Sequence, residues 1–465
     1  MKNRLENIKH VYLLGIGGIG MSALARYFKL NGCEVAGYDR TPSDITNQLT
    51  DLGIAIHFED NIELFPGSWT LENTLIIVTP AIPADLKELN ELKSRGFELL
   101  KRSQVLGLLT RDKTGIAVAG THGKTSVSTM CGHIMHRSKQ GCSAFLGGIA
   151  NNYNSNLLLS ENDSENVVVE ADEFDRSFLQ LYPHYAAITS MDADHLDIYE
   201  THENLLEAFH QFIQQIDAGG VLINKKGLPV DKSRNQEITY RTYSLKEEAD
   251  YYTQNLQITE DGFTFDLVTP NGRIENLNLP YPGWINVENS VVASALALEA
   301  GVGEEELRAA LTDYQGVKRR FQLKLKNEKH VLIDDYAHHP EELRVTITSV
   351  KEMYAGRKVT GVFQPHLYSR TNDFAVEFAE SLSLLDELIL LDIYPARELP
   401  MEGVTSEIIF DKVKLLKKQL IVKEQLTDVI NNGDWDVVLM MGAGDIDRLV
   451  APVKTILENS DKDVE

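Results

Sequence analysis

The chain is poor in cysteine and lacks long apolar runs. Its 465 residues include three cysteines, Cys33, Cys131 and Cys142, which lie far apart and form no C-x-x-C pair. This pattern argues against a disulfide framework and against a cysteine zinc cluster, and it fits a reducing compartment. No stretch approaches the roughly 18 uninterrupted apolar residues of a membrane helix. We therefore expect a cytoplasmic protein without membrane insertion.

Positive charge is also scarce. Lys and Arg number 45 against 69 Asp and Glu, which gives a formal net charge of −24. Such a charge repels nucleic acid and anionic membrane surfaces, so we expect no nucleic-acid partner. Phosphate ligands are not excluded, because glycine loops and helix N-termini bind anions locally against an overall negative field.

Short apolar strand patterns alternate with helical patterns in three successive sets. This alternation predicts an α/β protein with mainly parallel sheets. A new strand pattern, KTGIAVAG, begins near residue 113, and another set begins after GVKRRFQ. We therefore expect domains at residues 1–110, 111–318 and 319–465. Residues 230–280 are more polar and contain an Asn-Gly turn, which predicts a small antiparallel excursion with a hairpin.

A first glycine loop, GIGGIG, follows the strand pattern HVYLL. Its spacing is that of the dinucleotide fingerprint, which places a pyrophosphate at a helix N-terminus, with an acidic residue about 20 positions later on a ribose hydroxyl. NAD and a UDP-sugar both carry a pyrophosphate and a ribose, so both are candidate ligands. The candidate binding residues are Gly15, Gly17, Gly18, Ile19, Gly20 and Asp39.

A second glycine loop, GTHGKTS, follows the strand pattern KTGIAVAG. The common phosphate loop, G-x-x-x-x-G-K-[ST], would require glycine at Val118, and Gly120 supplies it two residues late. Lys124 can neutralise phosphate charge, the Thr125 hydroxyl can bind Mg²⁺, and backbone N–H groups from Gly120 to Lys124 can face phosphate oxygens. GTP is disfavoured because Gly227 replaces the Asp of a guanine-binding N-K-x-D motif. The predicted ATP-binding residues here are Gly120, Thr121, His122, Gly123, Lys124, Thr125 and Ser126.

Acidic residues follow two later strand patterns. The first group is Glu170, Asp172, Glu173 and Asp175, and the second is Asp192, Asp194, His195 and Asp197. Ligands gather at the carboxyl ends of parallel strands, and Mg²⁺ prefers oxygen donors. These residues are therefore candidate ligands of Mg²⁺, or of Mn²⁺, beside the phosphates.

The third set of strands carries basic residues at its strand ends. His366 and Arg370 follow a strand pattern and are placed to bind a carboxylate by charge-assisted hydrogen bonds. His338 and His339 follow a pair of aspartates, but no third spaced ligand completes a zinc site.

Taken in order, GIGGIGMSALA, AGTHGKTS, EADEFD, DADHLD, GVKRRF, DDYAHHP, FQPHLYSRT and DIYPARE resemble the Mur ligases of peptidoglycan synthesis. The resemblance spans nearly the whole chain. It implies a Rossmann-like N-terminal domain for a UDP-sugar, a P-loop central ATPase domain and a Rossmann-like C-terminal domain that closes over the site. The family's short loop, G-T-x-G-K-[ST], fits residues 120–125.

The resemblance also implies roles for single residues. The implied metal ligands are Thr125 and Glu170 for one Mg²⁺ and His195 for a second. The further implied ATP contacts are Asn289, Arg320 and Asp334. The implied amino-acid contacts are His366 and Arg370, and the implied catalytic residues are Lys124, His338 and Arg370. Three positions depart from the family pattern, namely Ile285 in place of a His, Leu367 in place of a basic residue, and Thr79-Pro80 in place of a serine pair.

The implied activity is ATP-dependent ligation. The enzyme would join L-alanine to the lactyl carboxylate of UDP-N-acetylmuramate through an acyl phosphate. Three alternatives stay open: a recycling ligase that adds a peptide to the same sugar, a nicotinamide dehydrogenase, and a nucleotide-dependent scaffold. A homodimer is also open.

Overall fold

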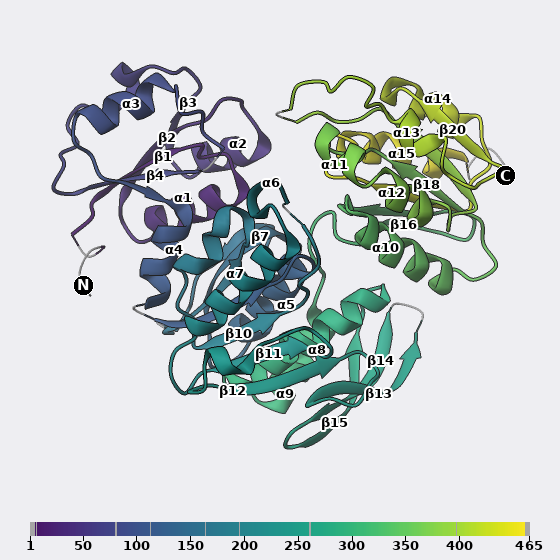
Figure 1. The fold of residues 1–465 in the computed structure, drawn as a ribbon, viewed down its shortest axis with the longest axis horizontal. Coiled ribbons are helices and arrows are strands. Elements are labelled where there is room, and N and C mark those ends of the chain that lie inside the picture. The colour runs from purple at the N-terminus through teal and green to yellow at the C-terminus, as the bar shows by residue number, and fades with distance from the viewer. Residues whose placement is uncertain are drawn as a thin grey trace. The chain divides into compact units, whose positions relative to one another are not determined.

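The computed structural model describes residues 5, 7–79, 81–111, 113–162, 164–194, 196–259, 262–396 and 398–460. The chain forms two compact units. Unit 1 consists of Met1–Gln257, Thr264–Pro280 and Glu288–Gln315, and unit 2 of Ile258–Phe263, Tyr281–Val287 and Gly316–Glu465. Across the described residues the strands form three sheets (Figure 1), which confirms the prediction of three α/β sets.

The first sheet is parallel, with the strand order β3-β2-β1-β4-β5. Its strands are β1 (His10–Leu14), β2 (Glu34–Tyr38), β3 (Ala55–His57), β4 (Thr74–Val78) and β5 (Leu99–Lys101). Its helices are α1 (Ile19–Leu30), α2 (Asp44–Asp51), α3 (Lys87–Ser94) and α4 (Arg102–Arg111). Because the strand order reverses between β1 and β4, the loop after β1 lies at the switch point where such sheets bind ligands.

The central sheet has the order β15-β14-β13-β12-β11-β10-β6-β9-β7-β8. The strands around the phosphate-type loop are β6 (Thr114–Ala119), β7 (Ser143–Ala150), β8 (Ser155–Leu158), β9 (Asn166–Ala171) and β10 (Tyr185–Ile188). The remaining strands are β11 (Val221–Lys225), β12 (Thr239–Ser244), β13 (Tyr251–Ile258), β14 (Phe263–Thr269) and β15 (Gly272–Leu279). The helices are α5 (Lys124–Arg137), α6 (Leu196–Tyr199), α7 (His202–Gln214), α8 (Trp284–Glu299) and α9 (Glu304–Asp313).

The antiparallel excursion predicted between residues 230 and 280 continues the central sheet, and its strands β12 and β13 pair in parallel. Strands β13, β14 and β15 extend the central sheet beyond β12, because each finds a free strand edge to pair with. The expected hairpin is present, since β14 and β15 are neighbours joined by Pro270 and Asn271.

The first two sheets share one packed interior within unit 1. A single cluster of buried apolar side chains runs from Val11 in β1 to Leu222 in β11. Helix α1 packs on β7 and β8, where the buried Asn156 donates hydrogen bonds to the Ile19 carbonyl at 2.5 Å and the Ser22 hydroxyl at 3.0 Å. The first glycine loop is therefore tied to the domain that carries the second.

The third sheet lies in unit 2, with the order β16-β17-β21-β18-β19-β20 and only β16 antiparallel. Its strands are β16 (Gln322–Lys326), β17 (Val331–Asp335), β18 (Val359–Phe363), β19 (Glu387–Leu391), β20 (Lys418–Ile421) and β21 (Val437–Met441). Its helices are α10 (Pro340–Met353), α11 (Tyr368–Asp373), α12 (Ala375–Leu382), α13 (Glu407–Phe410), α14 (Leu426–Asn431) and α15 (Asp447–Ser460). Among the helices in the described ranges, none has the length and apolar character needed to cross a membrane.

Candidate functional site

The predicted phosphate loop joins β6 to α5. Gly120 has a φ of 136° and Gly123 a φ of 81°, both in the region that favours glycine. A Cβ on Gly120 would lie 2.2 Å from the hydroxyl oxygen of Thr189, so only glycine lets the loop pass this residue. The first-turn N–H groups of α5 have no intrahelical acceptor and lie at the positive end of the helix dipole. The loop has the geometry of a phosphate-binding turn.

Ser190, which follows β10, holds this loop in place. Its hydroxyl accepts from the His122 amide at 2.7 Å, and its carbonyl accepts from the Thr121 amide at 3.3 Å. These two amides, expected to face phosphate oxygens, are thus engaged with Ser190, and phosphate contacts are left to the amides that follow. The His122 ring lies 3.7 Å from the Asp192 carboxylate. The loop is therefore braced by its own domain.

Lys124 is held by charged and backbone partners. Its Nζ donates to the Gly120 carbonyl at 2.8 Å and lies 2.7 and 2.9 Å from the two Glu173 carboxylate oxygens. Burial alone would lower the pKa of Lys124. Carboxylates outweigh that effect, Glu173 first and then Asp172 and Glu170, so the net pKa is raised above its usual value. Lys124 is therefore an ammonium at neutral pH.

Glu170 and Thr125 offer oxygen donors close to the loop. Glu170 lies opposite Val118 in the pairing of β9 with β6, and Thr125 is buried in the first turn of α5. Gly147 in β7 makes room for the carboxylate, because a Cβ there would lie 1.9 Å from Glu170 Oε2. Hydroxyl and carboxylate oxygens suit Mg²⁺, which binds through one or two protein groups and substrate phosphates.

The charge around the loop also fits a divalent cation. Three carboxylates act on the one Lys124 ammonium, which leaves an excess of negative charge. His195, the predicted ligand of a second ion, lies outside the described residues. Within the described ranges, no group of three or more His, Cys, Asp or Glu side chains is arranged to hold a metal by itself. The donor set therefore fits a cation that phosphate oxygens help to bind.

Asn289 from α8 lies beside the phosphate loop. The position of a Cβ on Gly123 would be 3.3 Å from Asn289 Oδ1, and the Asn289 side chain is buried. The adenine contact predicted for Asn289 stays a prediction, because the contact that the structure describes is with the loop.

The first glycine loop is closed by Asp39. The Gly17 amide donates to Asp39 Oδ2 at 2.7 Å, and the Thr41 amide donates to Oδ1 at 3.3 Å. The ribose contact predicted for Asp39 is untested, but its carboxylate already serves the loop. Gly15, with a φ of 85°, lets the chain turn out of β1, and Gly18 is the N-cap of α1. The N-terminus of α1 thus has the local geometry that the fingerprint requires, and pyrophosphate binding there stays a prediction.

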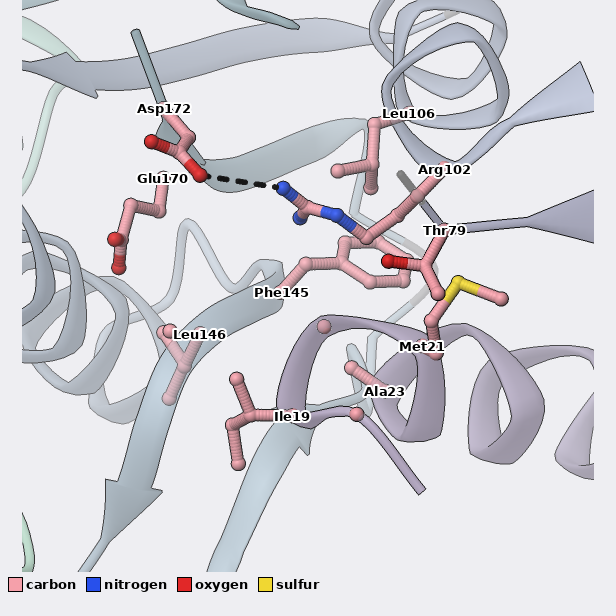
Figure 2. Close-up of a pocket in the computed structure, with 13 residues that line it drawn as sticks. Ile19, Met21, Ala23, Thr79, Arg102, Leu106, Phe145, Leu146, Glu170 and Asp172 are labelled. Carbon is pink, nitrogen blue, oxygen red and sulfur yellow. Dashed lines mark ion pairs between the residues drawn. The ribbon is translucent and has the colours of Figure 1, made fainter. Parts of the chain in front are cut away.

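A cavity of about 240 Å³ lies between the N-terminus of α1 and the acidic end of β9. Figure 2 shows Arg102 reaching from α4 toward Asp172, and Ile19 at the start of α1 also lines the cavity. The guanidinium is 3.9 Å from the Asp172 carboxylate. A Cβ on Gly20 would lie 2.9 Å from the Arg102 guanidinium, so the cation lies against the helix N-terminus. The cavity is lined by Gly18, Ile19, Gly20, Met21, Ala23, Thr79, Arg102, Leu106, Phe145, Leu146, Gly147, Glu170 and Asp172.

Arg102 and Gly147 are site residues that the sequence analysis missed. Arg102 begins α4 directly after β5, at the carboxyl edge of the first sheet, and this position was the available signal. Gly147 belongs to no glycine motif. Its importance appears only when β7 and β9 are paired, so sequence inspection had no signal for it.

In unit 2, the predicted residues His338, His366 and Arg370 gather at the carboxyl ends of β17 and β18. The two imidazole rings are 6.0 Å apart, centre to centre. Burial lowers the pKa of His338 to about 3. The Glu342 carboxylate opposes this shift, and the Arg370 cation adds to it. His338 Nδ1 faces the Tyr336 carbonyl at 3.0 Å and the Glu342 carboxylate at 3.3 Å. The proton of the neutral ring therefore lies on Nδ1, and Nε2 carries a free lone pair.

Asp334 and Arg320, the predicted ATP contacts of unit 2, lie at the same end of β17. Burial raises the pKa of Asp334 to about 6, although Arg319 lies 3.8 Å away. The Arg320 guanidinium lies 4.9 Å from the centre of the Tyr336 ring and 3.9 Å from the Glu342 carboxylate. These contacts orient Arg320 beside His338.

Leu367, which stands where the family pattern has a basic residue, lies in a turn with an unusual backbone conformation. It has a φ of 72° just before α11, and its amide donates to the Tyr394 carbonyl at 3.0 Å. His366 pairs with Tyr394 in an isolated bridge, with the rings 5.9 Å apart. The turn that carries His366 and Arg370 is thus fastened to the loop after β19.

Family models match three parts of the chain. The model described as "Mur ligase family, catalytic domain" matches residues 10–114, "Mur ligase middle domain" matches 118–297, and "Mur ligase, glutamate ligase domain" matches 319–444.

Full-length relatives agree with these matches. The UDP-N-acetylmuramate–L-alanine ligase of Parabacteroides distasonis is 53% identical over 97% of this chain and 98% of the relative. That of Porphyromonas gingivalis strain W83 is 50% identical over 97% of this chain and 99% of the relative. The solved UDP-N-acetylmuramate-alanine ligase MurC from Thermotoga maritima superposes with a TM-score of 0.79 at 26% identity, over 98% of this chain and 99% of that chain. A murein peptide ligase from Psychrobacter arcticus, 21% identical with a TM-score of 0.67 over 97% of this chain and 99% of that chain, shares the fold.

Proposed function

The chain belongs to the Mur ligase family, and on that basis we propose that it joins L-alanine to the lactyl carboxylate of UDP-N-acetylmuramate at the expense of ATP. The reaction makes a precursor of peptidoglycan. Relatives with 53% and 50% identity over nearly the whole chain carry this activity in their names, which supports the assignment.

The observation that carries the proposal is the cavity of unit 1. It is lined by the N-terminus of α1, by the Arg102 guanidinium and by the Glu170 and Asp172 carboxylates. A UDP-sugar held by its pyrophosphate at α1 and Arg102 would extend its acyl end toward the ATP loop. A nicotinamide dehydrogenase would have no use for that loop, and a scaffold would have no use for the cavity.

The first step is transfer of the γ-phosphoryl group of ATP to the lactyl carboxylate, which gives an acyl phosphate and ADP. We assign neutralisation of the transferring group to Lys124 and its orientation to the first-turn amides of α5. Thr125 and Glu170 would hold a Mg²⁺ ion, with His195 for a second, which supplies positive charge to the phosphate oxygens.

The second step is attack of the L-alanine amine on the acyl phosphate carbonyl, with release of phosphate. Arg370 and His366 would bind the amino-acid carboxylate by charge-assisted hydrogen bonds. His338 is the proposed base, because its Nε2 carries the lone pair of the neutral ring. A pKa of about 3 makes it a weak base, so we place the proton transfer after the C–N bond has begun to form, when the attacking nitrogen is strongly acidic.

The remaining proposals concern organisation. We propose domains of residues 1–110, 111–318 and 319–465, and the family matches at 10–114, 118–297 and 319–444 support boundaries close to these. We also propose a cytoplasmic enzyme, for which the three free cysteines are the supporting observation.

Phosphate release from ATP tests the activity. With UDP-N-acetylmuramate present, L-alanine should raise release far above the rates with glycine or with a tripeptide. A preference for the tripeptide would instead identify a recycling ligase. Release that no amine stimulates would refute ligation altogether.

A further inference from the structure

The Glu173 carboxylate, to which the proposed reaction assigns no role, lies directly against Lys124. Its oxygens are 2.7 and 2.9 Å from Lys124 Nζ, and its side chain is wholly buried, while that of Lys124 is 12% exposed. A further Nζ contact goes to the Gly120 carbonyl at 2.8 Å. The ammonium is therefore folded back into its own loop and held there by a buried anion.

The main chain at Glu173 is fixed. Its carbonyl accepts hydrogen bonds from the hydroxyl of the buried Tyr199 at 2.6 Å and from the Arg176 amide at 2.9 Å. Glu173 also directly precedes the 3₁₀ helix Phe174–Gln180, which restrains it further. Lys124, by contrast, has a flexible four-carbon stem. The backbone that carries the Glu173 side chain is therefore restrained, whereas the Lys124 ammonium ends a long stem that can shift.

The charges decide which contact Lys124 gives up. A buried carboxylate that loses its counter-ion is strongly unfavourable, whereas a neutral carbonyl is readily exchanged. Lys124 therefore keeps Glu173 and trades the Gly120 carbonyl for a phosphate oxygen. Toward the nucleotide, the pair then presents much less positive charge than a lone lysine would, which weakens the attraction for ATP and ADP alike. In return, the ammonium has one fixed position during transfer.

We propose that Glu173 is a positioning residue of phosphoryl transfer, which acts through Lys124 and lowers the affinity of the site for nucleotides. The proposal rests on the proposed function, because it requires that the loop at residues 120–126 binds ATP.

The test measures nucleotide affinity and turnover separately in the full-length protein. Glu173→Gln should bind Mg-ADP and Mg-ATP at least about tenfold more tightly, and its kcat should fall at least about tenfold. Glu173→Asp keeps the charge and should retain an affinity near that of the wild type. Glu207→Gln is the matched control, because it removes an equal charge and breaks an ion pair, that with Arg234, outside the phosphate loop, and its ADP affinity should change by less than about threefold.

A second comparison remains decisive if Glu173→Gln does not fold. Lys124→Met and Lys124→Met/Glu173→Gln should bind ADP with affinities within about threefold of each other, because an effect that acts through Lys124 is lost when Lys124 is absent. A difference greater than about threefold would overturn the proposal, as would unchanged or weaker ADP binding by folded Glu173→Gln. Absence of nucleotide binding by the wild type would overturn the proposed function as well, so the two failures are distinguishable.

Discussion

Adding a single methyl group at Gly147 should lower the catalytic rate without lowering the stability of the fold. A Cβ on this residue would lie 1.9 Å from Glu170 Oε2, although real Cβ contacts are essentially never closer than 3.0 Å. In Gly147→Ala the separation must therefore grow by about 1.1 Å, and the carboxylate is the part that can move, because it ends a flexible side chain. The backbone of Gly147 does not have a positive φ, so alanine adds no strain there.

The expected effect is on turnover. A misplacement of about 1 Å in a group that orients the reacting atoms costs roughly 10²-fold in rate, so kcat should fall by about that factor. The Mg²⁺ concentration for half-maximal activity should rise, because Glu170 is the proposed ligand that moves. Thermal stability should stay close to that of the wild type. The assay is L-alanine-dependent phosphate release at saturating substrates, titrated with Mg²⁺.

Gly67→Ala is the control, because a Cβ there would meet nothing within 4 Å. It should leave both turnover and the Mg²⁺ requirement unchanged. If Gly147→Ala retained kcat within about threefold of the wild type at the same Mg²⁺ concentration, the proposed role of Glu170 would be refuted.

Four further substitutions have distinct expected results. Lys124→Ala should lower kcat by about 10²- to 10³-fold while leaving equilibrium binding of UDP-N-acetylmuramate intact; a weaker UDP-sugar complex would contradict separate roles for the two loops. Arg102→Ala should do the reverse and weaken UDP-N-acetylmuramate binding about tenfold or more, with ADP affinity unchanged by calorimetry. His338→Gln should lower kcat by about 10²-fold or more, and between pH 5 and 8 the wild-type rate should show no step from this group, because its pKa is about 3. Burial raises the pKa of Asp334 from 3.8 to about 6, so the folded state binds this proton more tightly than the unfolded state does. The free energy of unfolding should therefore fall by up to about 3 kcal/mol as pH rises through that interval. Asp334→Asn should therefore melt at a higher temperature than the wild type at pH 7.5 and at a similar temperature at pH 4.

The parts of the fold that depend on local pattern could be predicted. The strand before Gly15 and the strand before Gly120 read as apolar runs because parallel strands are buried on both faces. Within each loop, glycine is needed where φ is positive or where another residue lies too close for a Cβ, as at Gly120 and Gly123. The polar strands near residues 230–280 were harder, because strand propensity does not indicate which sheet a strand joins.

Site residues could be predicted only where the residues that act together lie close together in the sequence. Lys124 and Thr125 share one loop, and His338 follows β17 directly. The role of Arg102 depends on α4 meeting α1, and that of Glu173 on β9 lying beside β6, which are long-range pairings. The brace from Ser190 to the His122 amide spans 68 positions in the chain, so neither residue reveals it by spacing. Nothing in the fingerprint motif suggested that Asp39 would close its own loop.

Asn156 has a consequence for inhibitor chemistry. Because its side chain bonds the first turn of α1 to β8, the first and second glycine loops belong to one unit with a shared interior. The distance between the two proposed phosphate sites is therefore set by packing. A tethered compound that carries a pyrophosphate mimic at one end and a nucleotide at the other would need one linker length, and shortening or lengthening that linker should abolish the benefit of joining the halves.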